Sequence, residues 1–125
     1  MLHQDITDNI IKAFYKIYNS LGYGFLEKVY ENAMDIELRK MGFLVTKQKN
    51  IKVYYENEEV GDYYADLSVN DLVIVEMKAS ESLRAEHEAQ LINYLKATSI
   101  EVGLLLNFGK KAEFKRNIFT NDRKK

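Results

Sequence analysis

The chain of 125 residues contains no cysteine, no proline and no tryptophan. Without cysteine it can form neither disulfide bonds nor thiolate metal sites. No apolar run approaches the length that a membrane-spanning helix needs. The first ten residues, MLHQDITDNI, also lack the basic and apolar regions of a signal peptide. We therefore expect a cytoplasmic protein that does not act in a membrane.

An excess of charge of one sign is also absent. There are 18 Lys and Arg side chains against 19 Asp and Glu side chains, which gives a net charge of -1. Proteins dedicated to binding duplex nucleic acid usually carry a basic excess. Any basic surface must therefore be local, and the densest basic cluster is the C-terminal stretch KRNIFTNDRKK. A solvated chain terminus also explains that cluster and is the more usual cause of one.

The composition favours one folded domain. Hydrophobic residues make up 46% of the chain, enough for a core, and charged residues make up 30%. A length of 125 residues is typical of a single domain, and no repeat or linker interrupts the sequence. We expect one domain over residues 1–125.

Hydrophobic periodicity predicts three helices and a set of strands. The helices are expected at residues 6–21, 25–41 and 83–98. Residues 43–69 are expected to form two or three strands, with turns near Asn50, Asn57 and Gly61. The two most apolar strands are expected at residues 72–78 and 101–108, and residues 113–119 at an edge strand or a helical turn.

The order of these elements predicts the fold class. The two most apolar strands flank the third helix, as in a right-handed crossover between parallel strands. We therefore expect a mixed β-sheet flanked by helices, which is an α/β fold, or α+β by the stricter definition.

The stretch ADLSVNDLVIVEMKAS contains the first candidate site. Because side chains alternate along a strand, Glu76 and Lys78 share one face, and the preceding strand carries Asp66. Mg²⁺ prefers oxygen ligands and lowers the pKa of a bound water, while a lysine can stabilise the charge that develops. Two acids and a lysine therefore suit phosphoryl chemistry, although a salt-bridged sheet edge is also compatible with this spacing.

A shared metal depends on the turn between the two acids. A two-residue loop would place Asp66 opposite Val75, and the acids would point to opposite faces of the sheet. A three-residue loop places Asp66 opposite Glu76, and it requires a left-handed residue, which Asn70 or Asp71 tolerates. The metal hypothesis therefore predicts the three-residue loop.

Two helices supply further candidates. The second helix opens with GFLEKVY, in which Glu27 and Tyr30 are three residues apart and share a face. A carboxylate in the first turn, such as Glu27, also complements the helix dipole, which is the alternative role. On the third helix His87, Gln90 and Tyr94 form a polar stripe. Such a stripe is typical of a solvated face, although these side chains also tolerate partial burial.

Together these motifs resemble those of the GxxExxY family, a compact branch of the PD-(D/E)xK nuclease superfamily. The resemblance extends from about residue 6 to residue 119. Ala65 stands where the superfamily name has proline, a residue without a metal-binding atom. The matching residues are Gly24, Glu27 and Tyr30 of the first motif, Asp66, Glu76 and Lys78 of the second, and Gln90 and Tyr94 of a Q-x-x-x-Y signature.

The resemblance implies a fold and a metal site. The fold is the restriction-endonuclease-like sheet with an αβββαβ core, here with an extra N-terminal helix. Mg²⁺ or Mn²⁺ would be held by Asp66, Glu76 and Glu27, and Lys78 would assist the attacking water.

The resemblance also implies a substrate. Gln90 and Tyr94 would orient the lysine or contact the phosphate backbone. Tyr30 belongs to the same group of supporting residues, and His87 would donate a hydrogen bond there or serve a structural role. The expected activity is metal-dependent hydrolysis of nucleic acid, with DNA as the expected substrate. The alternative is a non-cleaving module on the same scaffold that binds nucleic acid or protein, and a homodimer or a protein partner is compatible with both.

Overall fold

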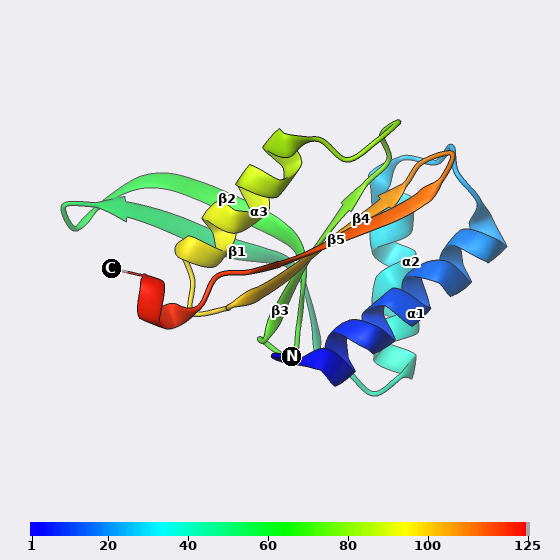
Figure 1. Ribbon diagram of the computed structural model, residues 1–125, viewed down its shortest axis with the longest axis horizontal. Coiled ribbons are helices and arrows are strands. Elements are labelled where there is room, and N and C mark those ends of the chain that lie inside the picture. Colours follow the sequence, from blue (N-terminus) through cyan, green and yellow to red (C-terminus); the bar gives the residue numbers. More distant parts are fainter. Residues whose placement is uncertain (125) are drawn as a thin grey trace.

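The computed structural model describes residues 1–124 and shows a five-stranded sheet with helices on both faces (Figure 1). The helices are α1 (Gln4–Leu21), α2 (Glu27–Lys40) and α3 (Ala85–Lys96), followed by a short 3₁₀ helix, η1 (Asn121–Arg123). The strands are β1 (Val45–Tyr55), β2 (Glu58–Val69), β3 (Val73–Lys78), β4 (Val102–Phe108) and β5 (Ala112–Ile118). The expected α+β class and the order of elements are confirmed, and the last segment forms an edge strand.

The sheet is mixed, with strand order β1-β2-β3-β4-β5. Only β3 and β4 are parallel, and α3 connects them, whereas every other neighbouring pair is antiparallel. Elements α2 to β4 therefore form the expected αβββαβ core, with α1 and β5 added at its ends. In residues 1–124 no helix is long and apolar enough to cross a membrane.

Each face of the sheet has its own hydrophobic core. Helices α1 and α2 cover one face, where Phe14 and Met34 pack against Val75. Helix α3 covers the other face, where Leu91 is fully buried. A Cβ atom at Gly103 would lie 2.7 Å from the Leu91 side chain, so α3 packs directly on the backbone of β4. This close packing holds α3 at a fixed height above the sheet.

The hairpin formed by β1 and β2 extends beyond α3 as a long arm (Figure 1). Its strands have 11 and 12 residues, and one turn joins them at Glu56 and Asn57, both of which have left-handed φ. The turns predicted near Asn50 and Gly61 are wrong, because both residues are paired within the strands. Asparagine and glycine favour turns, but the backbone pairing between β1 and β2 continues through both positions. Leu72, predicted as a strand residue, lies in the β2–β3 turn and is 39% exposed.

Candidate functional site

The turn between β2 and β3 has three residues, 70–72, as the metal hypothesis predicts. Asn70 and Asp71 both adopt left-handed φ, 53° and 54°. Asn70 is also tied to the chain before β1, since its N–H donates to the carbonyl of Leu44 (2.7 Å) and its Oδ1 accepts from the Leu44 N–H (2.8 Å). These contacts fix the length of the turn and with it the pairing of the two strands.

The resulting register brings the two acids together. The paired residues of β2 and β3 end at Leu67 and Val75, and the next residues, Asp66 and Glu76, are in hydrogen-bond contact, as the three-residue loop predicts. Beyond this point carboxylate oxygens, in place of backbone carbonyls, accept the hydrogen bonds between the two strands. The Asp66 N–H donates to Glu76 Oε2 (2.6 Å), and the Met77 N–H donates to Asp66 Oδ2 (2.8 Å). Each carboxylate is therefore oriented by a backbone N–H of the neighbouring strand.

Strand β2 changes face at Asp66. Residues two apart normally share a face of a strand, yet Ala65 belongs to the core under α3 and Leu67 to the core under α1 and α2. Opposite Asp66, β1 has Gln48 in a left-handed conformation, with φ of 52°. The irregularity in both strands makes the arm depart from the sheet here, so the two carboxylates lie at the point where β2 separates from β3.

Both carboxyl groups have raised pKa values. Glu76 is only 4% exposed. Burial, and then the charge of Asp66, raises the pKa of Glu76 to about 8. Burial likewise raises the pKa of Asp66, against the hydrogen bond from Met77, which lowers it. The charge of Lys78 lowers both pKa values but does not offset burial. Such a pair is stabilised in its charged form by a bound divalent cation, so its chemistry fits Mg²⁺ or Mn²⁺.

Sequence reasoning missed a third buried acid, Glu31 on α2, which is 4% exposed. Its carboxylate accepts hydrogen bonds from Lys28 (2.9 Å) and from Gln48 (2.8 Å), the residue opposite Asp66. Its negative charge contributes to the raised pKa of both Asp66 and Glu76. The available signal was its spacing, because Glu31 falls three residues before Met34 and seven before Leu38, on the buried stripe of α2.

Glu27 is exposed at the first residue of α2, where a carboxylate complements the helix dipole. Its charge raises the pKa of Asp66, but less than the charge of Glu31 does. Within residues 1–124 no three His, Cys, Asp or Glu side chains are grouped closely enough to hold a metal ion. The structure therefore assembles the Asp66–Glu76 pair without Glu27 as a third member, and a metal-binding role for Glu27 stays a prediction.

Lys78, Gln90 and Tyr94 form a hydrogen-bonded chain. The Lys78 ammonium donates to Gln90 Oε1 (3.3 Å), and Gln90 Nε2 donates to Tyr94 Oη (3.1 Å). Burial, and then the charges of Glu76 and Asp66, raises the pKa of Tyr94 to about 12. The phenol therefore stays protonated at neutral pH. The structure thus brings the predicted lysine, amide and phenol to the face of the sheet that carries Glu76.

His87 has a structural contact at the start of α3. Its Nδ1 accepts a hydrogen bond from the N–H of Arg84 (3.1 Å), which caps the helix N-terminus. Burial, and then the charge of Lys78, lowers the pKa of His87. The imidazole is therefore held neutral and as an acceptor, in keeping with the structural role.

Tyr30 requires a correction. The side chain is fully buried and stacks on Phe108 at 4.0 Å between ring centroids. Its hydroxyl donates to the carbonyl of Gly22 (2.7 Å) and accepts from the N–H of Phe25 (3.2 Å). Tyr30 therefore closes the loop between α1 and α2, and its hydroxyl is not directed at a substrate. Spacing on the helix could not reveal this contact.

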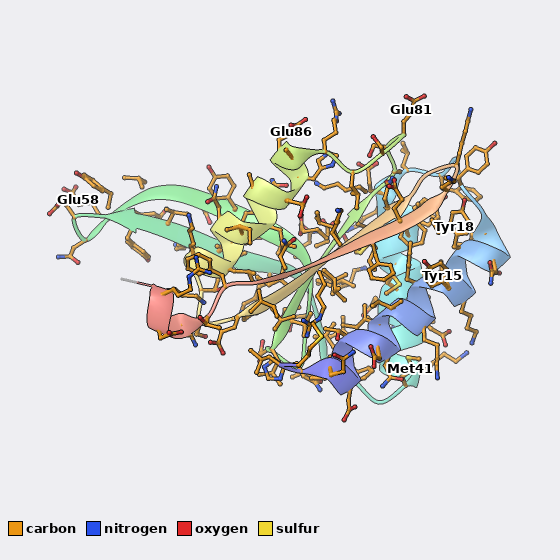
Figure 2. The ribbon with its side chains drawn as sticks, viewed as in Figure 1. Tyr15, Tyr18, Met41, Glu58, Glu81 and Glu86 are labelled. Carbon is orange, nitrogen blue, oxygen red and sulfur yellow. The ribbon has the colours of Figure 1, made fainter. Side chains whose placement is uncertain are left out.

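Asn107 fixes the chain that follows Lys78, and sequence reasoning also missed it. This fully buried amide accepts from the Ser80 N–H (3.0 Å) and donates to the Ser80 carbonyl (2.9 Å). A Cβ atom at Gly109 would lie 2.4 Å from the same carbonyl. Figure 2 shows Glu81, the next residue, at the tip of this loop. A polar residue within the apolar run LLLNFG was the available signal.

Comparisons with known proteins found a matching family and a similar fold. The chain matches the family described as the PD-(D/E)XK nuclease superfamily over residues 4–117. Its fold resembles the crystal structure of SSO0001 with a TM-score of 0.59 and 16% identity, over 74% of this chain and 50% of that chain. At this identity the likeness concerns the fold alone, and this chain spans about half the length of that protein. No curated protein matches the chain.

Proposed function

This chain belongs to the PD-(D/E)XK nuclease superfamily, and we propose that it is a metal-dependent nuclease that hydrolyses phosphodiester bonds, with DNA as the first substrate to test. The observation that carries the proposal is the buried pair Asp66 and Glu76 at the point where β2 separates from β3. We assign it to the GxxExxY branch on the motif Gly24, Glu27 and Tyr30, and we place its activity in the cytoplasm.

Asp66 and Glu76 would hold Mg²⁺ or Mn²⁺ through oxygen atoms, the ligands that these ions prefer. The backbone hydrogen bonds engage Oδ2 of Asp66 and Oε2 of Glu76, so each carboxylate is already oriented. When bound, the metal lowers the pKa of a water and neutralises charge on the phosphate. Glu27, exposed at the start of α2, would act through metal-bound water.

Lys78 would stabilise negative charge that develops on the phosphate and hold the attacking water in position. Its ammonium is oriented by Gln90, whose amide is in turn held by Tyr94. Because Tyr94 accepts from Gln90, its own proton remains available for a phosphate oxygen. The lysine is therefore a positioning and charge-stabilising group, and it need not remove a proton from water.

The test is cleavage of single- and double-stranded DNA and RNA by the purified chain with Mg²⁺, with Mn²⁺ and with EDTA. We expect cleavage with metal, none with EDTA, and loss of cleavage in Asp66→Asn. Glu81→Gln, which neutralises an exposed acid in the loop after β3, is the matched control and should cleave normally. Absence of cleavage on every substrate with both metals, or full activity of Asp66→Asn, would overturn the proposal.

A non-cleaving binding module on the same scaffold is the second candidate. Such a module would bind nucleic acid or protein, and the near-neutral net charge of -1 favours it because a protein partner does not require a basic surface. This candidate predicts no cleavage with either metal in the same experiment, together with metal-independent binding of nucleic acid or of a protein partner in a separate binding assay.

A further inference from the structure

A groove of about 800 Å³ lies between α3 and the arm formed by β1 and β2. Figure 1 shows α3 alongside the arm, and Figure 2 shows Glu86 on α3 and Glu58 at the tip of the arm. Residues from both elements line it, among them Val53, Tyr54 and Tyr63 from the arm and Ala89, Gln90 and Tyr94 from α3. Its volume is in the range of pockets that hold small organic ligands.

Exposed aromatic rings line the groove. Tyr54 and Tyr63 are 60% and 48% exposed, so their rings are accessible to a ligand. The ring of Tyr63 lies 6.0 Å from the ring of Tyr94 and is tilted by 45° to it. A Cβ atom at Gly61 would lie 2.9 Å from Cε2 of Tyr63, so the glycine lets this ring lie along the arm. The groove therefore offers aromatic surface to a planar ligand.

The groove adjoins the proposed catalytic residues. Gln90 and Tyr94 line it, and the same two side chains hold Lys78. A ligand with a phosphate at the carboxylate pair would therefore extend from that position into the groove, over Tyr94 and towards Tyr63.

We infer that this groove binds an unpaired strand of nucleic acid, and that the substrate class is single-stranded or locally unwound. The inference rests on the proposed function, whose substrate it specifies. Unpaired bases stack on aromatic side chains in grooves that also carry basic residues for the phosphates, whereas a duplex keeps its bases stacked inside.

Basic side chains for the phosphates are present in the lining. Lys52 and Lys96 both line the groove together with Glu86, and the charges of Glu59 and Asp62 also act on Lys52. Lys52 pairs with Glu59 at 3.1 Å on the exposed arm. Because exposed ion pairs contribute little, Lys52 can exchange this carboxylate for a phosphate. The two lysines therefore supply positive charge beside the aromatic rings although the whole chain is nearly neutral.

The experiment is fluorescence anisotropy in EDTA, so that binding is measured without cleavage. The probes are labelled oligothymidylate and oligouridylate of about 12 nucleotides, within the site sizes of strand-binding grooves, and a DNA duplex of the same length. We expect the single strands to bind more tightly than the duplex. Tyr63→Ala should weaken single-strand binding about tenfold, the loss typical of one stacked base, and Tyr63→Phe, which keeps the ring, should bind normally.

Tyr64→Ala is the matched control. Tyr64 is the next residue, is 53% exposed, and points to the opposite face of the arm, since it pairs with Asn50 and alternates with Tyr63. It should bind as the unmodified chain does. Ala89→Glu is a second variant that leaves Tyr63 intact and adds a carboxylate at an exposed position of the groove wall. It should weaken single-strand binding without loss of helix content by circular dichroism.

Equal affinity of Tyr63→Ala and the unmodified chain, or a preference for the duplex, would overturn the inference. The outcome for the nuclease proposal is separate. If single-strand binding depends on Tyr63 but no metal-dependent cleavage is found, the nuclease proposal is overturned and the groove assignment is supported. Metal-dependent cleavage, combined with single-strand binding that Tyr63→Ala does not weaken, would support the nuclease proposal and overturn the groove assignment.

Discussion

The backbone N–H of Asp66 donates a hydrogen bond of 2.6 Å to Oε2 of Glu76, across two strands that stop pairing at this point. Glu76 therefore takes the place of a backbone carbonyl in the sheet ladder. The bond orients the carboxylate, but it does not compensate for burial, since the pKa of Glu76 is still raised. The site thus combines ordered acceptors with a cost to holding both carboxylates charged, a cost that a bound divalent cation would remove.

The raised pKa of Glu76 predicts how stability changes with pH. In the unfolded chain this carboxyl titrates near 4.5, and in the folded chain near 8. The folded state therefore binds more protons between these values, so the stabilising contribution is complete below 4.5 and is lost as pH rises through 8. In EDTA the free energy of unfolding should fall across this window, as measured by urea denaturation.

Glu76→Gln is the control for that measurement. Because glutamine does not titrate, the variant should show a flatter pH dependence over the same window. Mg²⁺ should stabilise the unmodified chain most at the alkaline end, where both carboxylates are charged. An unchanged pH profile in Glu76→Gln would contradict the assignment of the raised pKa to this residue.

The β2–β3 turn should be sensitive to Asn70. Asn70→Ala places an alanine at a left-handed φ and removes the hydrogen bond to Leu44, at a combined cost of about 1–3 kcal/mol. Asn70→Gly loses only the hydrogen bond and should cost about 1 kcal/mol. Denaturant unfolding measures both values. Equal stability of the two variants would show that left-handed strain at residue 70 is unimportant.

Lys78→Ala should reduce cleavage on the order of 10²-fold, because a group that stabilises developing charge is removed. Mn²⁺ binding should remain nearly unchanged, because the lysine is not a ligand. Lys78→Arg keeps the charge with a different shape and reach, so we expect partial activity. Cleavage rates and calorimetric Mn²⁺ affinities separate these effects. Normal cleavage by Lys78→Ala would remove the lysine from the mechanism.

Asn107→Ala should affect cleavage through the loop after β3. The substitution leaves the N–H and carbonyl of Ser80 without their amide partner, at a cost of about 1–3 kcal/mol in the free energy of unfolding. Since Lys78 ends the strand that enters this loop, cleavage should fall while Mn²⁺ affinity is retained. Loss of Mn²⁺ affinity in the folded variant would point to a different role.

The sequence predicted those parts of the site that local chemistry determines. Asn70 and Asp71 tolerate left-handed φ, which made the three-residue turn possible, and the metal hypothesis then selected this turn and the register of Asp66. The predicted turns at Asn50 and Gly61 were wrong, because local preference cannot show that the two strands continue to pair.

Residues whose roles depend on distant partners could not be predicted in this way. Glu31 is buried against Gln48, and Asn107 binds a residue 27 positions away. The hydroxyl of Tyr30 bonds to Gly22, a contact that requires the path of the loop between two helices. In each case a polar side chain on an apolar stripe or within an apolar run was visible, but its partner was not.

The most direct test of the central claim is calorimetric titration of Mn²⁺ into the unmodified chain and into Asp66→Asn, with cleavage measured on the same samples. Asparagine keeps the shape of the side chain and can still accept the N–H of Met77, so the fold should be retained. The account predicts that the variant loses both Mn²⁺ binding and cleavage. Undiminished Mn²⁺ binding and cleavage in Asp66→Asn would contradict it.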